Sequence, residues 1–173
     1  MIAGFLLGAW AQPDSYHWQW DAISSLASQE AAQRWWMTGG FVGNGICHLF
    51  TARRMPRSWG RVLIAVGGVA VLLVALFPEQ PDHTSFMHDF GAGLAFFTLA
   101  AWPVFAIDER VWATRRNVAI AASATMLTLL AWFLATLFGV PALGLVERAL
   151  AVAEALWPLI VLESVRRSRE SVA

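Results

Sequence analysis

The sequence contains no lysine, a single cysteine and little charge of either sign. Charged residues make up 14% of the chain, about half the fraction found in soluble globular domains, whereas 58% of the residues are hydrophobic. So few charges cannot cover a surface that faces water on all sides, so the composition predicts an integral membrane protein. Cys47 has no second cysteine with which to form an internal disulfide or a CxxC redox pair.

The charges that are present cancel, because twelve acidic residues balance twelve arginines. No basic tract interleaved with aromatic residues offers a surface for phosphates. The net charge of zero and the lack of a basic tract argue against nucleic acid as a partner. They leave membrane lipids, a second copy of the chain or another membrane subunit as the expected partners.

Hydrophobic runs divide the chain into segments long enough to cross a bilayer. Five of them have roughly the 17–23 residues that a hydrocarbon core of about 30 Å requires; they cover residues 35–52, 61–77, 88–107, 117–138 and 145–165. Residues 1–11 are also apolar but would rise only about 16 Å as a helix. We interpret them as the outer half of a first membrane helix whose start is missing or misassigned. The predicted fold is therefore all-α: one domain over residues 1–173, a six-helix transmembrane bundle with a short first helix.

The arginines predict the orientation of this bundle. Ten of the twelve fall in alternate connections and in the C-terminal tail: Arg53, Arg54, Arg57, Arg61, Arg110, Arg115, Arg116, Arg166, Arg167 and Arg169. The positive-inside rule places these segments in the cytoplasm. Both termini are then inside, and the loops at residues 12–33 and 78–87 face outward.

An outer layer of polar residues is expected at the ends of the helices that face outward. It comprises Asp14, His17, Asp21, Ser24, Ser25, Glu79, Asp82, His83, His88, Asp89, Glu147 and Arg148. Histidine and carboxylate side chains can hold zinc or a similar divalent ion, which activates water at an open coordination position. His83, His88 and Asp89 are the candidate metal ligands. The spacing of five between the histidines differs from that of HExxH, and the alternative is that His88 and Asp89 cap the fourth helix.

A nucleophilic site is a further alternative, with Ser24, His88 and Asp89 as the catalytic candidates. Adjacent histidine and aspartate side chains on a helix point in different directions, which disfavours this arrangement.

A second, deeper layer of polar residues lies within the predicted helices. Asn44, Thr98 and Glu154 are each nine or ten residues from the outer end of their helix, about 14 Å deep, so they could meet. A carboxyl group inside a membrane is costly and by default indicates a functional site. Glu154 follows Glu147 by seven residues, so the two share a helix face and predict a polar path inward. The alternative is a protonated Glu154 that is hydrogen-bonded to Asn44 and holds helices together.

Haem is not expected. His48 lies deeper than His88, whereas two axial ligands of one haem must lie at the same depth.

Three short motifs carry a family resemblance: Ile23-Ser24-x-Leu26, Phe77-Pro78 followed by His88, and Glu147-Arg148 followed by Trp157. Together they resemble the multi-pass prokaryotic membrane family called domain of unknown function 998, over almost the whole chain. The resemblance implies a six-helix bundle in a bacterial plasma membrane and no settled activity.

The sequence thus leads to two functional expectations. In the first, an outward-facing pocket binds a lipid headgroup or a small polar ligand, or the protein is a transport or membrane-complex subunit. The residues expected to line this pocket are His88, Glu147, Arg148, Glu154 and Asn44. In the second, a His/Asp/Glu site at the outer face belongs to a metal-dependent membrane hydrolase. Whether the protein is an enzyme stays open.

Overall fold

The computed structural model describes residues 1–80 and 85–170, and within these residues every regular element is a helix, with no strand. The all-α prediction is confirmed. The elements in chain order are α1 (Ile2–Trp10), η1 (Ser24–Ala27), α2 (Trp35–Arg54), α3 (Trp59–Leu76), α4 (Phe86–Ala101), η2 (Trp102–Phe105), η3 (Trp112–Thr114), α5 (Arg116–Thr136) and α6 (Leu143–Glu170), where η denotes a 3-10 helix.

Helices α2, α3 and α5 begin and end within two residues of the predicted segments. Helix α4 ends earlier than predicted, at Ala101, where the chain tightens into η2. Pro103 has no N–H for an α-helical hydrogen bond, so the change of helix type occurs at this point. Helix α6 extends further than predicted, to Glu170, since exposed ion pairs from Arg166 to Glu163 and Glu170 span its last turns.

The start of α4 differs from the expectation that His88 and Asp89 cap it. Ser85 is the N-cap, and its hydroxyl accepts a hydrogen bond from the backbone N–H of His88 at 3.4 Å. His88 and Asp89 lie within the first turn of the helix, so their side chains are available for other contacts.

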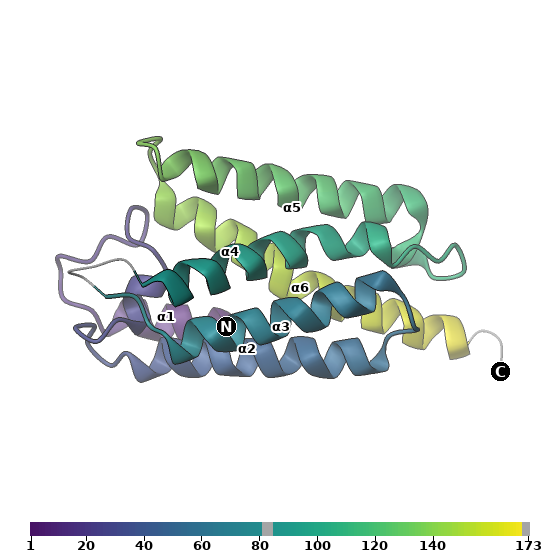
Figure 1. The fold of residues 1–173 in the computed structure, drawn as a ribbon, viewed down its shortest axis with the longest axis horizontal. Helices are drawn as coiled ribbons and strands as arrows, with labels where there is room; N and C mark the ends of the chain where they lie inside the picture. Colours follow the sequence, from purple (N-terminus) through teal and green to yellow (C-terminus); the bar gives the residue numbers. More distant parts are fainter. Residues whose placement is uncertain (81–84, 171–173) are drawn as a thin grey trace.

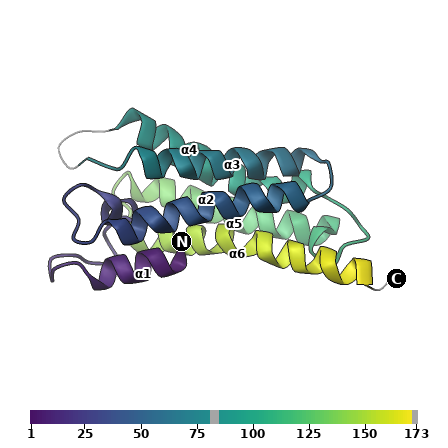
Figure 2. The ribbon, with the colours of Figure 1, turned by 90° about the horizontal axis from the view of Figure 1, so that it is seen from below.

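Successive helices run antiparallel and pack side by side, as Figures 1 and 2 show, and α6 lies along α2, α4 and α5. The contact between α2 and α3 is close because glycines face each other. A Cβ atom on Gly45 would lie 2.8 Å from the carbonyl oxygen of Gly68, and one on Gly68 would lie 2.9 Å from that of Gly45. Side chains larger than hydrogen would push these two helices apart.

The two ends of the bundle differ in charge. The α2–α3 connection, the α4–α5 connection and the end of α6 lie at one end (Figure 1), and these segments, together with the helix turns next to them, contain the ten arginines named above. We call it the arginine end. The connections after α1, α3 and α5 lie at the opposite end, here called the loop end, where the arginines are Arg34 and Arg148.

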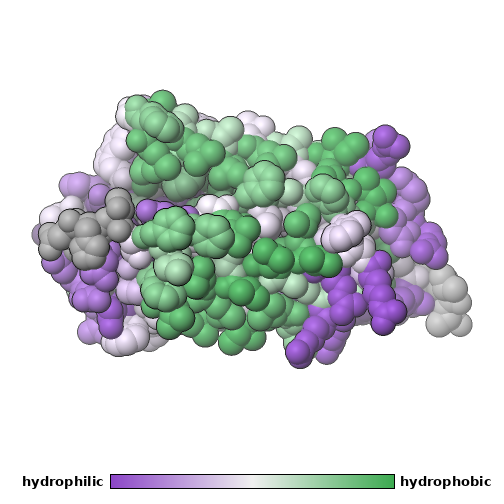
Figure 3. All heavy atoms as spheres, in the orientation of Figure 1, coloured by the Kyte–Doolittle hydropathy of each residue, from purple (hydrophilic) through white to green (hydrophobic). Residues whose placement is uncertain are grey.

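The surface between these ends is apolar. On the face shown in Figure 3, hydrophobic residues cover the middle of the molecule and hydrophilic residues gather at both ends. Within the described residues, α3 and α5 are each long and apolar enough to cross a membrane, judged by length and composition. Only 22% of the apolar stretch of α5 is buried, so most of its apolar side chains face outward.

Candidate functional site

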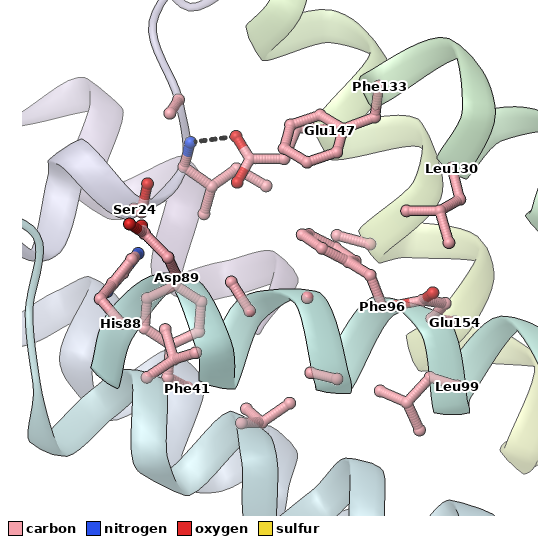
Figure 4. Close-up of a pocket in the computed structure, with 18 of the residues that line it drawn as sticks. Ser24, Phe41, His88, Asp89, Phe96, Leu99, Leu130, Phe133, Glu147 and Glu154 are labelled. Atoms are coloured by element: carbon pink, nitrogen blue, oxygen red, sulfur yellow. Dashed lines mark hydrogen bonds between the residues drawn. The ribbon is translucent and has the colours of Figure 1, made fainter. Parts of the chain in front are cut away.

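A cavity of about 340 Å³ opens towards the loop end of the bundle. It lies between η1 and helices α2 to α6, and Figure 4 shows its walls. The middle of the cavity is apolar: its lining includes Ala92, Ala95, Phe96, Leu99, Leu130, Phe133 and Ala151. Polar side chains lie at the two ends, with Ser24, Glu79, His88, Asp89 and Glu147 forming the outer set and Asn44 and Glu154 the inner set.

Helix α6 supplies one wall with a single face. Glu147, Ala151 and Glu154 follow each other at intervals of four and three residues, so their side chains lie above one another, and all three line the cavity. The shared face that the spacing of the two glutamates predicts is therefore present. Seven residues of helix separate them by about 10 Å, which sets the distance between the outer and inner polar sets.

Glu147 ties the first loop to α6. Its Oε2 accepts a hydrogen bond from the backbone N–H of Ile23 at 2.6 Å, and the residue is buried. Ile23 is the N-cap of η1, where a backbone N–H has no partner within the helix, so the carboxylate supplies one. This contact brings η1, and with it Ser24, to the cavity.

Ser24 joins the first loop to the segment after α3. Its hydroxyl donates a hydrogen bond to Oε2 of Glu79 at 2.7 Å. The hydroxyl hydrogen is thus directed to a carboxylate and away from the His88 ring. The Ser24, His88 and Asp89 arrangement considered from the sequence stays a prediction, and among the described residues no hydrogen bond joins Ser24 to His88.

His88 is buried and its ring is oriented by the backbone. Its Nδ1 lies 2.9 Å from the carbonyl oxygen of Phe77. A carbonyl only accepts, so Nδ1 donates the hydrogen bond in this contact. In Figure 4, His88, Asp89 and Ser24 lie at the same end of the cavity, away from Glu154.

The proposed metal-ligand set of His83, His88 and Asp89 stays a prediction. His83 lies outside the described residues. Within the described part of the chain, no group of three His, Cys, Asp or Glu side chains is placed to hold a metal ion. His88 and Asp89 therefore enter the site as polar lining of the cavity.

Arg148 does not line the cavity, contrary to the expectation from the sequence. Its Nη1 donates to the carbonyl oxygens of Asp21 at 3.0 Å and Gly144 at 2.8 Å, and its Nη2 donates to the hydroxyl of Tyr16. One residue along an α-helix turns the side chain by about 100°, so Arg148 faces the first loop where Glu147 faces the cavity.

Tyr16 is a structural contact that the sequence did not indicate. It lies in a loop rich in aromatic residues, and such residues are common wherever a chain meets the membrane surface. The structure singles it out because its hydroxyl meets the Arg148 guanidinium. Burial raises the pKa of the Tyr16 hydroxyl above its ordinary value of 10.0, and the nearby Arg148 partly opposes the rise.

The inner set differs in part from the predicted one. Asn44 and Glu154 both line the cavity, but Thr98 does not. The Thr98 hydroxyl donates to the carbonyl oxygen of Leu94 at 2.7 Å, and a Cβ on Gly67 of α3 would lie 3.0 Å from it. Thr98 therefore faces α3, and only two of the three predicted residues line the cavity.

Glu154 has no protein partner for one of its oxygens. The residue is 3% exposed, and Oε1 is buried without a hydrogen bond. Asn44 makes no hydrogen bond to it among the described residues, so the alternative in which this pair holds the helices together is not observed. Burying an unsatisfied polar group is costly, which marks Glu154 as a candidate binding group.

Comparison with known proteins gives one match. A family model described as "Protein of unknown function (DUF998)" matches residues 1–162 of the chain. No curated protein and no solved structure matches it.

Proposed function

The chain belongs to the DUF998 family of proteins of unknown function, and from this premise we propose that it is a membrane protein whose pocket binds an amphiphile. We infer six membrane spans in a bacterial plasma membrane, with both termini in the cytoplasm and the pocket facing outward. The ligand is a lipid-like molecule with a polar headgroup.

The distribution of charge and apolar surface supports the membrane placement. Ten arginines gather at one end of the bundle, as cytoplasmic segments do. Large apolar side chains are exposed between the ends, among them Leu6, Val69, Phe97, Trp132 and Leu159. An apolar band of this extent, flanked by polar ends, fits a hydrocarbon core better than water.

The chemistry of the cavity supports an amphiphile as the ligand, and this observation carries the proposal. Its outer set is polar, whereas the wall behind it is formed by alanine, leucine and phenylalanine side chains. A small polar ligand would leave these apolar walls unfilled, and a pure hydrocarbon would leave the carboxylates without partners. A molecule with a polar head and an apolar chain satisfies both.

The cavity also has a route for such a ligand. Gly93 of α4 and Leu134 and Leu137 of α5 line it and are exposed at the surface. The cavity therefore reaches the outside between these two helices, on the side that faces lipid in the proposed orientation. An amphiphile can enter there without passing through water.

Native mass spectrometry of the protein purified in a mild uncharged detergent tests the proposal. We expect the wild-type protein to retain one amphiphile. Ala151→Phe places a ring between the outer and inner polar sets and should remove the bound mass. Ala149→Phe is the matched control, because Ala149 is exposed on the same helix and does not line the cavity.

Equal retention by the two variants, with both folded as judged by circular dichroism, would refute the pocket as the binding site. A wild-type protein that carries no amphiphile and binds none on addition would refute the proposed function itself.

A further inference from the structure

We infer that the pocket selects an amphiphile whose headgroup is a protonated amine over one that is neutral or anionic. This inference rests on the proposed function and names the class of ligand.

Every charged side chain that lines the cavity is acidic. These are Glu79, Asp89, Glu147 and Glu154, and within the described residues no arginine joins them. The nearest candidate, Arg148, directs its guanidinium to Asp21 and Tyr16 in the first loop and to Gly144 of its own helix. Against these four acidic side chains the lining offers the α-amino group of Met1 and the ring of His88 as basic groups. A phosphate or carboxylate headgroup would therefore meet an excess of acidic groups, which is unfavourable in a partly buried site.

The side-chain donors at the outer set are already used within the protein. The Ser24 hydroxyl donates to Glu79, and Nδ1 of His88 donates to the carbonyl oxygen of Phe77. What the carboxyl groups of this set still offer are acceptors: both oxygens of Asp89 and the second oxygen of Glu147. An ammonium group has three N–H donors and no acceptor, so it matches this set better than a hydroxyl or an acid does.

Glu154 provides the second, independent observation. It lies about two helical turns further in on the same face of α6, it is 3% exposed, and its Oε1 has no partner. Because buried polar atoms are normally hydrogen-bonded, the Oε1 atom of Glu154 can accept a hydrogen bond from a ligand in the cavity. Glu154 is an acidic residue like those of the outer set, so the inner end of the pocket also has no arginine or lysine for an anion among the described residues.

Three probes of equal chain length separate the classes: octylamine, octanol and octanoate. Binding is measured at pH 7 in an uncharged detergent, as the probe concentration that gives half of the maximal rise in the unfolding temperature. The Ala151→Phe variant supplies the background, because it retains any effect of the probe on the micelle. We expect octylamine to bind at least about tenfold more tightly than octanol, and octanoate to bind most weakly.

Two isosteric variants test the role of charge. Asp89→Asn and Glu154→Gln should each weaken octylamine binding by roughly five- to tenfold and leave octanol binding unchanged. Asp14→Asn is the matched control, because Asp14 is exposed at the loop end of the bundle and does not line the cavity. It should leave the binding of all three probes unchanged.

The outcomes distinguish the two proposals. If the probes bind alike, or if the variants weaken octanol as much as octylamine, amine selection is wrong while the amphiphile pocket stands. If octanoate binds most tightly, amine selection is also wrong. If none of the probes binds to the wild-type protein above the Ala151→Phe background, both the proposed function and the amine inference are wrong.

Discussion

Replacing Arg148 with alanine should release the first loop without unfolding the bundle. The guanidinium makes three hydrogen bonds, to the carbonyl oxygens of Asp21 and Gly144 and to the hydroxyl of Tyr16. Two of these bonds reach the first loop, and each contributes about 1 kcal/mol net, so their loss should cost the loop about 2 kcal/mol of local stability. The packing among α2, α3, α4 and α5 does not involve Arg148, so the cost should fall on the loop.

Hydrogen exchange followed by mass spectrometry measures this local cost. A loss of about 2 kcal/mol corresponds to an increase of roughly thirtyfold in the exchange rate of protected amides in residues 12–23. The amide of Ile23 is the most informative, because it donates to Glu147 and should lose protection together with the loop. Exchange in α3 should stay at the wild-type rate.

Arg34→Ala is the matched control for this change. Arg34 is the other arginine at the loop end. Its guanidinium lies over the Trp35 ring, 4.4 Å from the ring centroid. Its removal should leave residues 12–23 unaffected. Wild-type exchange rates in the Arg148→Ala loop, or uniform loss of protection over all helices, would refute the proposed role of Arg148.

Two further predictions concern packing and titration. Gly45→Ala should destabilise the protein by about 1–3 kcal/mol, because the added Cβ would meet Gly68 of α3. Gly43→Ala is the control: its Cβ meets nothing within 4 Å, so the change should be neutral or stabilise the protein by up to about 1 kcal/mol. Equal shifts in unfolding temperature for the two variants would count against the close contact. Tyr16 is the only tyrosine of the chain, so alkaline difference absorbance follows the ionisation of its hydroxyl alone. We expect this hydroxyl to be half-ionised above pH 10 in the folded protein and near pH 10 in the denatured protein. Because the folded pKa is raised, the stability that Tyr16 contributes should be present below pH 10 and lost as pH rises through the folded pKa; folded and denatured proteins that titrate together would contradict its burial.

Helical periodicity explains why part of the site could be predicted from the sequence. Glu147 and Glu154 differ by seven residues, which fixes them to one face of any helix that contains both, and the structure has both at the cavity. The apolar runs likewise set the helices, since their lengths and their ends at proline or arginine are local features.

Contacts between distant segments could not be predicted in this way. Arg148 is adjacent to Glu147 in sequence, and only the position of the first loop shows that it binds Tyr16 and turns away from the cavity. Thr98 has the same depth as Asn44 and Glu154, but depth does not fix direction, and its helix directs it towards Gly67. The pairing of Ser24 with Glu79 spans 55 residues and depends on how two loops meet.

Photo-crosslinking of a bound ligand tests the central claim, an amphiphile in the pocket, most directly. The probe is an alkylamine with a diazirine in its chain, added to the purified protein, irradiated, and mapped by peptide mass spectrometry. The amphiphile pocket predicts labels on the cavity-lining residues Phe96, Leu130 and Phe133, reduced to background in Ala151→Phe and retained in Ala149→Phe. Labels of equal yield in both variants, or spread over exposed apolar residues of α3 such as Val62 and Val69, would contradict it.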